Sequence, residues 1–150
     1  MPDEADNVFF RLFNEIGILE QLSRALFQAR LPPGMLVSHF AVVNHLLRVK
    51  DGRTPLDLAR AFQVAKTTMT HTLSSLEKAG FIEMRPNAED ARSKRVWITK
   101  KGRAFRSNAI SEIGPDTASL EQEFSEARVK MILPELEELR KIMDERRNHN

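Results

Sequence analysis

The stretch EDARSKRVWITKKG, from Glu89 to Gly102, combines a polar turn, an alternating strand pattern and a dense group of cations. It contains only two acids, Glu89 and Asp90, and it carries the single tryptophan of the chain, Trp97. A solvated hairpin does not need so many cations, so the stretch predicts a surface that meets an anionic partner. Its basic residues are Arg92, Lys94, Arg95, Lys100 and Lys101.

The cationic character is confined to the middle of the chain. Residues 85–106 carry eight bases and two acids, whereas residues 112–147 carry ten acids and six bases. The first twenty residues are also acidic, with five acids and one base. One strongly basic segment between two acidic ends is typical of a chain that binds a polyanion through one face.

The composition is that of an ordinary folded protein. The 150 residues are 41% hydrophobic and 29% charged, which fits one structural unit or two small ones sharing a core. No run approaches the roughly 18 consecutive apolar residues of a membrane span, and the acidic beginning lacks a signal-peptide pattern. We therefore expect a cytoplasmic protein with no membrane partner. The absence of cysteine excludes disulfides, thiolate metal sites and a cysteine-based oxidant sensor.

The strand signals on either side of the polar turn predict a β-hairpin. Phe81–Arg85 alternates apolar and polar residues, and Arg95–Thr99 does the same, with a turn-rich polar connection between them. In such a strand Trp97 points to the opposite side from Val96 and Ile98. We interpret Trp97 as a core or partly buried residue; the alternative is that it lies beside a ligand cleft.

A helix-turn-helix is predicted immediately before the hairpin. Thr54 is a suitable N-cap, and Pro55 a suitable first residue, for a short helix that reaches about Phe62. The three residues QVA then break the helix. A second helix is expected over Lys66–Ala79, followed by Gly80 where a left-handed conformation is favoured.

The second of these helices is amphipathic, and its polar face is the candidate binding surface. Met69, Thr72, Leu73 and Leu76 share one side and are expected to pack inward. Hydroxyl, imidazole and ammonium groups occupy the other side, and such groups bond to phosphates and to base edges in a major groove. A merely solvated face is the alternative. The residues predicted to face the groove are Lys66, Thr67, Thr68, Thr70, His71 and Ser74.

Two helices are expected before the helix-turn-helix. Apolar residues recur at helical spacing between Asn7 and Ala29, and the sequence LPPG after them ends that helix. A second helix is expected over Ser38–Val49, with Ser38 as its N-cap, and the turn KDGR closes it.

Helices also follow the hairpin. Thr99 is expected to cap a helix that Gly114 and Pro115 kink, and Ser125 is expected to cap a last one. The first and last helices both carry wide apolar stripes. We expect two copies of the chain to interleave these helices in a symmetric dimer. The alternative is that the two stripes pack on each other within one monomer.

In this order, the elements and motifs resemble those of the MarR (multiple antibiotic resistance regulator) family. That family has a loop of an Asp, any residue, an Arg, then a polar and a basic residue, and a strand-to-helix junction of Leu or Ile, Thr, two residues and Gly. The matching residues are Asp90, Arg92, Ser93 and Lys94–Arg95 in the loop, and Ile98, Thr99 and Gly102 at the junction. The order of elements matches over nearly the whole chain.

The resemblance implies a mainly α-helical fold with a small β-hairpin wing. The winged helix-turn-helix core would span residues 38–106, and N- and C-terminal dimerisation helices would span residues 1–37 and 107–150. A homodimer that binds a pseudo-palindromic operator in double-stranded DNA is also implied, usually as a repressor relieved by a small-molecule effector whose identity the sequence does not give. No cofactor is implied. The alternative is a winged-helix module that binds a protein partner without sequence-specific DNA binding.

The resemblance also assigns roles within the wing. Arg92 matches the wing-tip arginine that enters the minor groove, and Asp90 orients Arg92 rather than contacting DNA. Lys94 and Arg95 are expected to bind DNA as well and to anchor the wing against phosphate. The alternative is that Asp90 and Arg92 form an exposed pair that only stabilises the loop, by about 0–1 kcal/mol.

Two positions depart from the family pattern. Ala65 stands where Ser or Thr often caps the recognition helix, and the loss of that hydrogen bond costs roughly 1 kcal/mol. His71 stands where arginine is frequent, so we expect DNA affinity to rise at mildly acidic pH if His71 is protonated near phosphate.

Metal binding and catalysis are not expected. His39 and His45 are six residues apart, about 240° around a helix, and do not form a chelating pair. The sequence has no G-x-S-x-G elbow, no Gly-rich phosphate loop and no H-E-x-x-H motif, so we expect no enzymatic activity.

Overall fold

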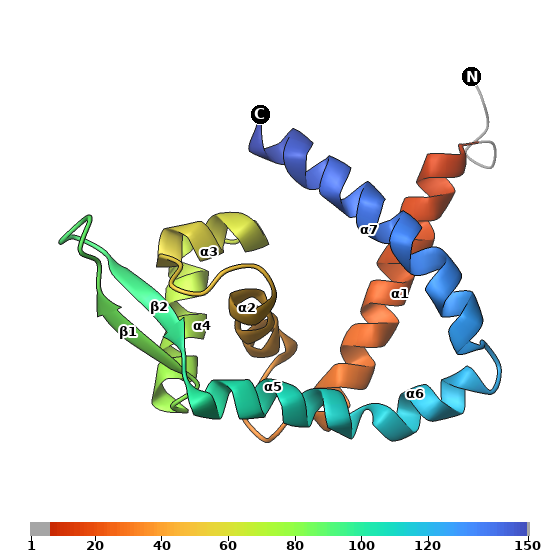
Figure 1. Cartoon of the computed structure of the whole chain (residues 1–150), viewed down its shortest axis with the longest axis horizontal. Coiled ribbons are helices and arrows are strands. Elements are labelled where there is room, and N and C mark those ends of the chain that lie inside the picture. The colour runs from red at the N-terminus through yellow and green to blue at the C-terminus, as the bar shows by residue number, and fades with distance from the viewer. Residues whose placement is uncertain (1–6, 150) are drawn as a thin grey trace. The chain divides into compact units, whose positions relative to one another are not determined.

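The fold is seen in a computed structural model that describes residues 7–149. It is mainly helical with one two-stranded antiparallel sheet, as predicted, and the chain divides after Glu112 into two compact units, Met1–Glu112 and Ile113–Asn150 (Figure 1). In chain order the elements are α1 (Val8–Arg30), α2 (Val37–Arg48), α3 (Pro55–Phe62), α4 (Lys66–Lys78), β1 (Ile82–Pro86), β2 (Lys94–Ile98), α5 (Lys100–Glu112), α6 (Gly114–Glu121) and α7 (Glu126–Asn148).

The start of α2 differs from the prediction. The helix begins at Val37 with Leu36 as its N-cap residue, so the prediction of Ser38 as the cap is wrong. Nδ1 of His39 accepts a hydrogen bond from the Leu36 N–H at 2.8 Å. An imidazole three residues into the helix thus satisfies the amide at its start, and no hydroxyl cap is needed.

α3 and α4 form the predicted helix-turn-helix. Thr54 Oγ1 accepts from the Asp57 N–H at 3.1 Å, and an Asp57 carboxylate oxygen accepts from the Thr54 N–H at 3.4 Å. This reciprocal pair fixes the start of α3. Gln63, with a φ of 53°, ends α3 in a left-handed conformation, and α4 begins at Lys66. Gly80, with a φ of 81°, follows α4 as predicted.

The hairpin has one apolar and one polar face. Antiparallel pairing sets Met84 opposite Val96 and Arg85 opposite Arg95, and directly opposite residues share a face. Ile82 and Val96 are buried, so their face packs on the helices. The hairpin extends away from α2, α3 and α4 as a wing (Figure 1).

The loop between α2 and α3 pairs with β2 over a short distance. The Val96 N–H donates to the Arg53 carbonyl at 2.7 Å, and the Gly52 N–H donates to the Val96 carbonyl at 3.0 Å. Gly52 has a φ of 70°, and a Cβ there would lie 2.7 Å from the Trp97 ring, so only glycine fits. Trp97 is half-buried against this loop, with the Arg85 guanidinium 5.3 Å from its ring centroid. It is therefore a packing residue of the wing.

Thr99 joins the hairpin to α5. Its Oγ1 accepts from the Gly102 N–H at 3.0 Å, which confirms the predicted cap, and its hydroxyl donates to the Gly80 carbonyl at 2.6 Å. The same residue thus caps α5 and holds the end of α4 beside it.

The predicted kink near Gly114 and Pro115 is a break between two helices. α5 ends at Glu112, and α6 begins at Gly114 with Pro115 in its first turn, where a proline N–H is not needed. Ser125 Oγ accepts from the Arg128 N–H at 3.3 Å and caps α7, as predicted.

The core of the first unit lies between α2, α3, α4 and the inner face of the hairpin. Burying a side chain of this size stabilises a fold by about 1.5–3 kcal/mol, so the wing and the helix-turn-helix fold as one unit. The largest fully buried side chains are Val42, Val43, Leu46, Leu58, Leu73, Leu76 and Val96.

A row of aromatic rings ties α1 and α5 to this core. The ring centroids of Phe27 and Phe40 are 5.2 Å apart, those of Phe40 and Phe105 are 6.4 Å apart, and those of Phe105 and Phe81 are 4.4 Å apart in a stacked pair. The row runs from α1 through α2 and α5 to the residue before β1.

α1 and α7 leave many large apolar side chains exposed, in contrast to the core helices. No helix within the described range has the length and apolarity needed to cross a membrane. The exposed side chains are Val8, Phe9, Phe10, Phe13, Ile16, Ile18, Leu19 and Leu22 in α1, and Val129, Met131, Ile132, Leu133, Leu136, Ile142 and Met143 in α7.

Candidate nucleic-acid interface

α4 presents its polar face to solvent because its apolar residues are buried beneath it. Met69, Leu73 and Leu76 are at most 3% exposed. Thr72, predicted to point inward with them, is half-buried, and its hydroxyl donates to the Thr68 carbonyl at 3.1 Å. The residues predicted to face a groove are all exposed: Lys66, Thr67, Thr68, Thr70, His71 and Ser74.

The start of α4 has no side-chain cap. Ala65 is the N-cap residue, and no side chain bonds to the first amides of the helix, as its sequence departure predicts. These amides remain donors at the positive end of the helix dipole. The Thr70 hydroxyl donates to the Lys66 carbonyl at 2.9 Å, so its oxygen stays available as an acceptor. This end of α4 therefore offers groups that suit phosphate oxygens and base edges.

Asn87 organises the loop that carries the wing tip. It is 8% exposed, its Nδ2 donates to Ser93 Oγ at 2.9 Å, and its Oδ1 accepts from the Glu89 N–H at 3.1 Å. The Asp90 N–H donates to the Asn87 carbonyl at 3.3 Å, and the Ser93 N–H donates to the Asp90 carbonyl at 3.1 Å. A buried amide thus holds a polar loop in one conformation.

Arg92 projects from this loop. Asp90 Oδ1 accepts from the Arg92 backbone N–H at 3.0 Å and from its Nε at 3.3 Å. The Arg92 side chain is 93% exposed, so the pair contributes little to stability and leaves most of the guanidinium available. The structure brings together the predicted wing-tip arginine and its predicted orienting acid.

Arg92 and Lys94 share a groove with the helix-turn-helix. Alternation along β2 places Lys94 on the inner face of the hairpin, with Val96, and places Arg95 on the outer face, with Trp97. The wing cations predicted to act together are therefore divided between two faces. The groove is lined by Thr54, Pro55 and Leu56 of the α3 start, Lys66 and Thr70 of α4, and Met84, Asn87, Asp90, Ala91, Arg92, Ser93 and Lys94 of the wing.

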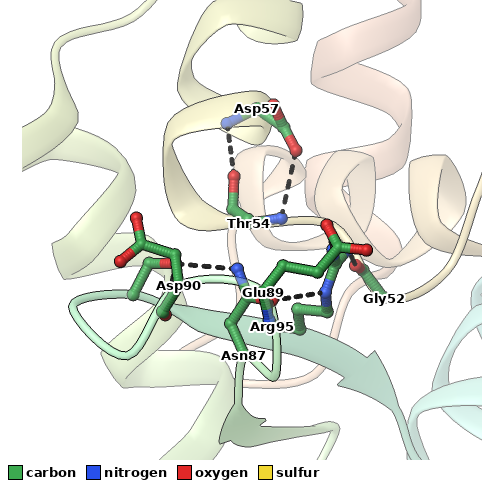
Figure 2. A network of polar contacts seen from close by, with 8 residues as sticks. Gly52, Thr54, Asp57, Asn87, Glu89, Asp90 and Arg95 are labelled. Atoms are coloured by element: carbon green, nitrogen blue, oxygen red, sulfur yellow. Dashed lines mark hydrogen bonds and ion pairs between the residues drawn. The ribbon is translucent and has the colours of Figure 1, made fainter.

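Arg95 is bonded within the protein through all three guanidinium nitrogens (Figure 2). Nη1 donates to the Gly52 carbonyl at 2.9 Å, Nε donates to Asn87 Oδ1 at 3.1 Å, and Nη2 donates to a Glu89 carboxylate oxygen at 3.2 Å. Its side chain is 27% exposed. Arg95 thus links the wing loop to the α2–α3 loop.

Sequence reasoning missed the inner partners of this network. The sequence marks Asp51 and Gly52 only as part of a turn, and Asn87 only as part of a polar connection. Asp-Gly marks a turn, but the pairing of that turn with a strand more than forty residues later has no local signature.

Two histidines of α2 have lowered pKa values. Burial lowers the pKa of His39, and nearby His71 lowers it further. Burial also lowers the pKa of His45, with further contributions from Arg53 and Arg48. Within residues 7–149, no cluster of three or more His, Cys, Asp or Glu side chains is placed to hold a metal ion.

A pocket of about 590 Å³ lies between the end of α1 and α5. Leu31, Phe81 and Phe105 supply apolar walls, and Lys101 and Asn108 supply polar groups. The Lys101 Nζ lies 5.5 Å from the Phe81 ring centroid. Arg30 and Glu112 also line the pocket, which therefore combines aromatic surface with charged groups of both signs.

Sequence comparison places the helix-turn-helix and most of the wing in a known family. A protein-family model described as MarR family matches residues 34–93. The Transcriptional activatory protein BadR of Rhodopseudomonas palustris is 31% identical over 101 residues, which cover 66% of this chain and 56% of BadR. The match thus spans a little over half the length of that relative.

Solved structures share the fold over most of the chain. A crystal structure of MarR matches with a TM-score of 0.82 at 22% identity, covering 93% of this chain and 95% of that one. A mutant MarR from E. coli complexed with operator DNA matches with a TM-score of 0.68 at 23% identity, covering 89% and 96%. The regulator BldR of Sulfolobus solfataricus matches with a TM-score of 0.73 at 21% identity, covering 96% and 99%. Because the family model matches residues 34–93 and solved MarR structures share the fold over most of the chain, this chain belongs to the MarR family of winged helix-turn-helix transcription regulators.

Proposed function

We propose that this chain regulates transcription by binding a pseudo-palindromic operator in double-stranded DNA as a homodimer. The observation that carries the proposal is the groove in which the exposed α4 face meets Arg92 and Lys94 of the wing. MarR-family transcription regulators are not enzymes, which agrees with the sequence prediction.

Each part of the surface has a distinct task in this proposal. The exposed residues of α4 contact base edges and phosphates in the major groove, with the uncapped amides after Ala65 adding donors to phosphate. Arg92 enters the minor groove, oriented by Asp90, and Lys94 contacts the backbone. Support comes from the solved MarR complex with operator DNA, which shares this fold.

The dimer is supported by the exposed apolar side chains of α1 and α7. Such extensive apolar surface is rare on a protein that acts alone, and a second copy of the chain can cover it symmetrically. We assign residues 1–37 and 107–150 to this dimerisation role and residues 38–106 to DNA binding. Two copies then present two α4 helices to two half-sites about one helical turn apart.

A small apolar carboxylate is the proposed class of effector. The pocket between α1 and α5 has aromatic walls and the Lys101 ammonium. Phe81, one of its walls, lies directly before β1, and its carbonyl accepts from the Thr99 N–H at 3.1 Å. A ligand that shifts Phe81 therefore acts on the base of the wing.

Titrating a panel of aromatic and aliphatic carboxylates into the protein–duplex complex tests this effector proposal. If a carboxylate releases the parent from the duplex at a concentration that leaves the Lys101→Met variant bound, the assignment is supported. If no carboxylate of the panel releases the parent, the assignment is contradicted.

Repression is the direction of control that the family resemblance implies for this chain. BadR, by contrast, is named as an activatory protein. A reporter gene placed behind the selected operator decides between the two directions. Reduced expression with the protein present supports repression, and increased expression assigns activation.

Selection of binding sequences from a random duplex library, at a stated salt concentration, tests the main proposal. An inverted repeat with half-sites about one helical turn apart is the expected result. The competing function, a protein-interaction module, predicts no enrichment. Salt dependence separates the two as well, because several phosphate contacts give a steep negative slope and a protein-docking module binds duplex weakly at any salt.

A further inference from the structure

We propose that Arg95 is a positioning residue that braces the wing against the α2–α3 loop, rather than a DNA contact, and that Asp51 completes this brace. The inference deepens the proposed function and rests on it, since the brace sets where the wing tip lies relative to α4. It assigns to Arg95 a task different from that of its neighbours Arg92 and Lys94.

The hairpin register separates Arg95 from the groove. Arg95 lies opposite Arg85 and on the same face as Trp97, which packs on the α2–α3 loop. Lys94 lies on the other face and lines the groove with Arg92 and Lys66. A phosphate held in that groove faces Lys94, not Arg95.

The guanidinium of Arg95 is already occupied by acceptors at fixed positions. The Gly52 carbonyl at 2.9 Å belongs to the α2–α3 loop, and Asn87 Oδ1 at 3.1 Å belongs to the buried amide that organises the wing loop. Both are neutral acceptors, and the third partner, Glu89, is 84% exposed and therefore adds little. A planar guanidinium can bridge these acceptors together, and a lysine ammonium cannot.

Asp51 holds the same loop to the other end of β2. Its Oδ1 accepts from the Ile98 N–H and from the Gly52 N–H, each at 3.0 Å. The backbone of Gly52 and Arg53 bonds to Val96 between these two points. The loop is thus fixed along the strand, and it gives Arg95 a rigid anchor.

The chain of contacts ends at the wing tip. Arg95 bonds Asn87, Asn87 bonds Ser93 and the Asp90 backbone, and Asp90 bonds Arg92. Loss of the guanidinium therefore frees the loop that aims Arg92. The effect of Arg95 on DNA passes through Arg92, which makes the inference testable.

A double-mutant cycle on the duplex recovered from the selection tests the brace. Arg95→Lys and Arg95→Gln are both expected to lower affinity roughly 10- to 100-fold, since hydrogen bonds to charged groups are lost. The slope of log affinity against log salt should stay near that of the parent. In an Arg92→Ala background the further loss should fall below about threefold, because the two residues act as one unit. Lys94→Gln is the matched control, and it should reduce the slope by about 1.8, because each of the two copies in the dimer loses one phosphate contact.

Two results would overturn the inference. Parental affinity in Arg95→Lys would show that charge alone suffices, as for a phosphate contact. Full additivity of Arg95→Gln with Arg92→Ala would show that Arg95 contacts DNA independently. Thermal denaturation of each variant establishes that it is folded at the assay temperature.

Fluorescence of the free protein separates this inference from the proposed function. Trp97 is the single tryptophan and packs on Gly52, so its emission maximum and its quenching by iodide report on the contact between wing and loop. Arg95→Gln and Arg95→Lys should red-shift the emission and increase quenching, and Lys94→Gln should change neither. Unchanged Trp97 emission and quenching in Arg95→Gln would refute the brace, whether or not the parent binds duplex. Failure of the parent to bind duplex would count against the proposed DNA binding and not against the brace.

Discussion

Arg92 is positioned to bind a ligand without contributing to the fold, because its side chain is 93% exposed and its bond is to the neighbouring Asp90. Arg92→Ala should weaken operator binding by about 1–3 kcal/mol and change the free energy of unfolding by less than about 0.5 kcal/mol. Fluorescence anisotropy with the selected duplex and urea denaturation measure the two quantities. Arg85→Ala is the control, since Arg85 is exposed on the outer face of the hairpin and pairs with Glu83. If Arg92→Ala binds as tightly as the parent, the wing-tip assignment is wrong.

Position 102 requires glycine because a side chain would not fit there, and not because of the backbone conformation. A Cβ at this position would lie 2.1 Å from the Phe81 carbonyl oxygen and 3.0 Å from an Ile98 side-chain carbon. Because the closest atom is backbone, Gly102→Ala should lower the free energy of unfolding by at least about 3 kcal/mol. Gly17→Ala is the comparison: a Cβ in that helical position meets nothing within 4 Å, so stability should be equal or higher by up to about 1 kcal/mol. Urea denaturation of both variants gives the answer, and equal stabilities would contradict it.

His39 makes the fold sensitive to mild acid. Burial and His71 lower the pKa of His39 in the folded chain below the unfolded value of 6.5. Unfolding therefore takes up a proton below that pH, so the stabilising contribution is complete above 6.5 and is lost as pH falls through the window between the two pKa values. Protonation also removes the Nδ1 acceptor of the Leu36 N–H.

Melting temperatures at several pH values test this effect. The parent should lose stability on acidification below neutral pH, and His39→Gln should lose less. His45 contributes in the same direction, so His39→Gln should retain part of the pH dependence. His149→Gln, at the exposed end of the chain, serves as the control and should follow the parent. If the melting temperature of His39→Gln depended on pH as that of the parent does, His39 would not be a cause of the acid sensitivity.

The start of α4 has no side-chain cap hydrogen bond. Ala65 has the extended backbone of an N-cap residue, with φ −63° and ψ 147°, but contributes no side-chain hydrogen bond. Ala65→Ser should therefore raise the free energy of unfolding by about 1 kcal/mol, because the serine oxygen accepts from an amide of the first turn. Ala65→Gly should change it by only a few tenths of a kcal/mol. Urea denaturation distinguishes the two variants. Should Ala65→Ser lose operator affinity while gaining stability, the uncapped amides would be assigned to phosphate binding.

The elements that the sequence predicts well are those with local determinants. Thr54, Ser125 and Thr99 cap helices as expected, since a hydroxyl next to a helical pattern acts over three residues. Ser38 failed because His39, inside the helix, reaches back to the first amide. Such competition between neighbouring side chains depends on rotamers, which a pattern does not encode.

The wing cations show where prediction from pattern ends. The loop motif correctly brought Asp90 and Arg92 together. Arg95 looks equivalent to Lys94 in sequence, yet its three internal bonds depend on Gly52 and Asn87. Those contacts arise from the tertiary arrangement of a loop and a strand, so only the structure separates an anchoring arginine from an exposed one.

For the assembled protein, the exposed apolar surface of α1 makes the strongest demand. Leu19 and Leu22 are 60% and 63% exposed, and they lie near the middle of a helix with no buried residue. Hydration of this much apolar surface is unfavourable. A second copy of the chain that covers it would form a dimer whose stability grows with the apolar area removed from water. In the proposed dimer, DNA affinity depends on this surface, because only a dimer engages two half-sites at once.

Leu22→Asp tests this dependence directly. A buried, unpaired carboxylate at a symmetric interface is introduced twice per dimer, so sedimentation should show monomers at concentrations where the parent is dimeric. Affinity for the inverted repeat should fall at least about tenfold as the second half-site is lost, while circular dichroism stays that of a folded helical protein. Val49→Asp is the matched control: Val49 is 51% exposed at the end of α2, outside the proposed interface, and both sedimentation and affinity should stay parental. A Leu22→Asp protein that remains dimeric would place the interface elsewhere, and a monomeric parent with full operator affinity would remove the dimer from the proposal.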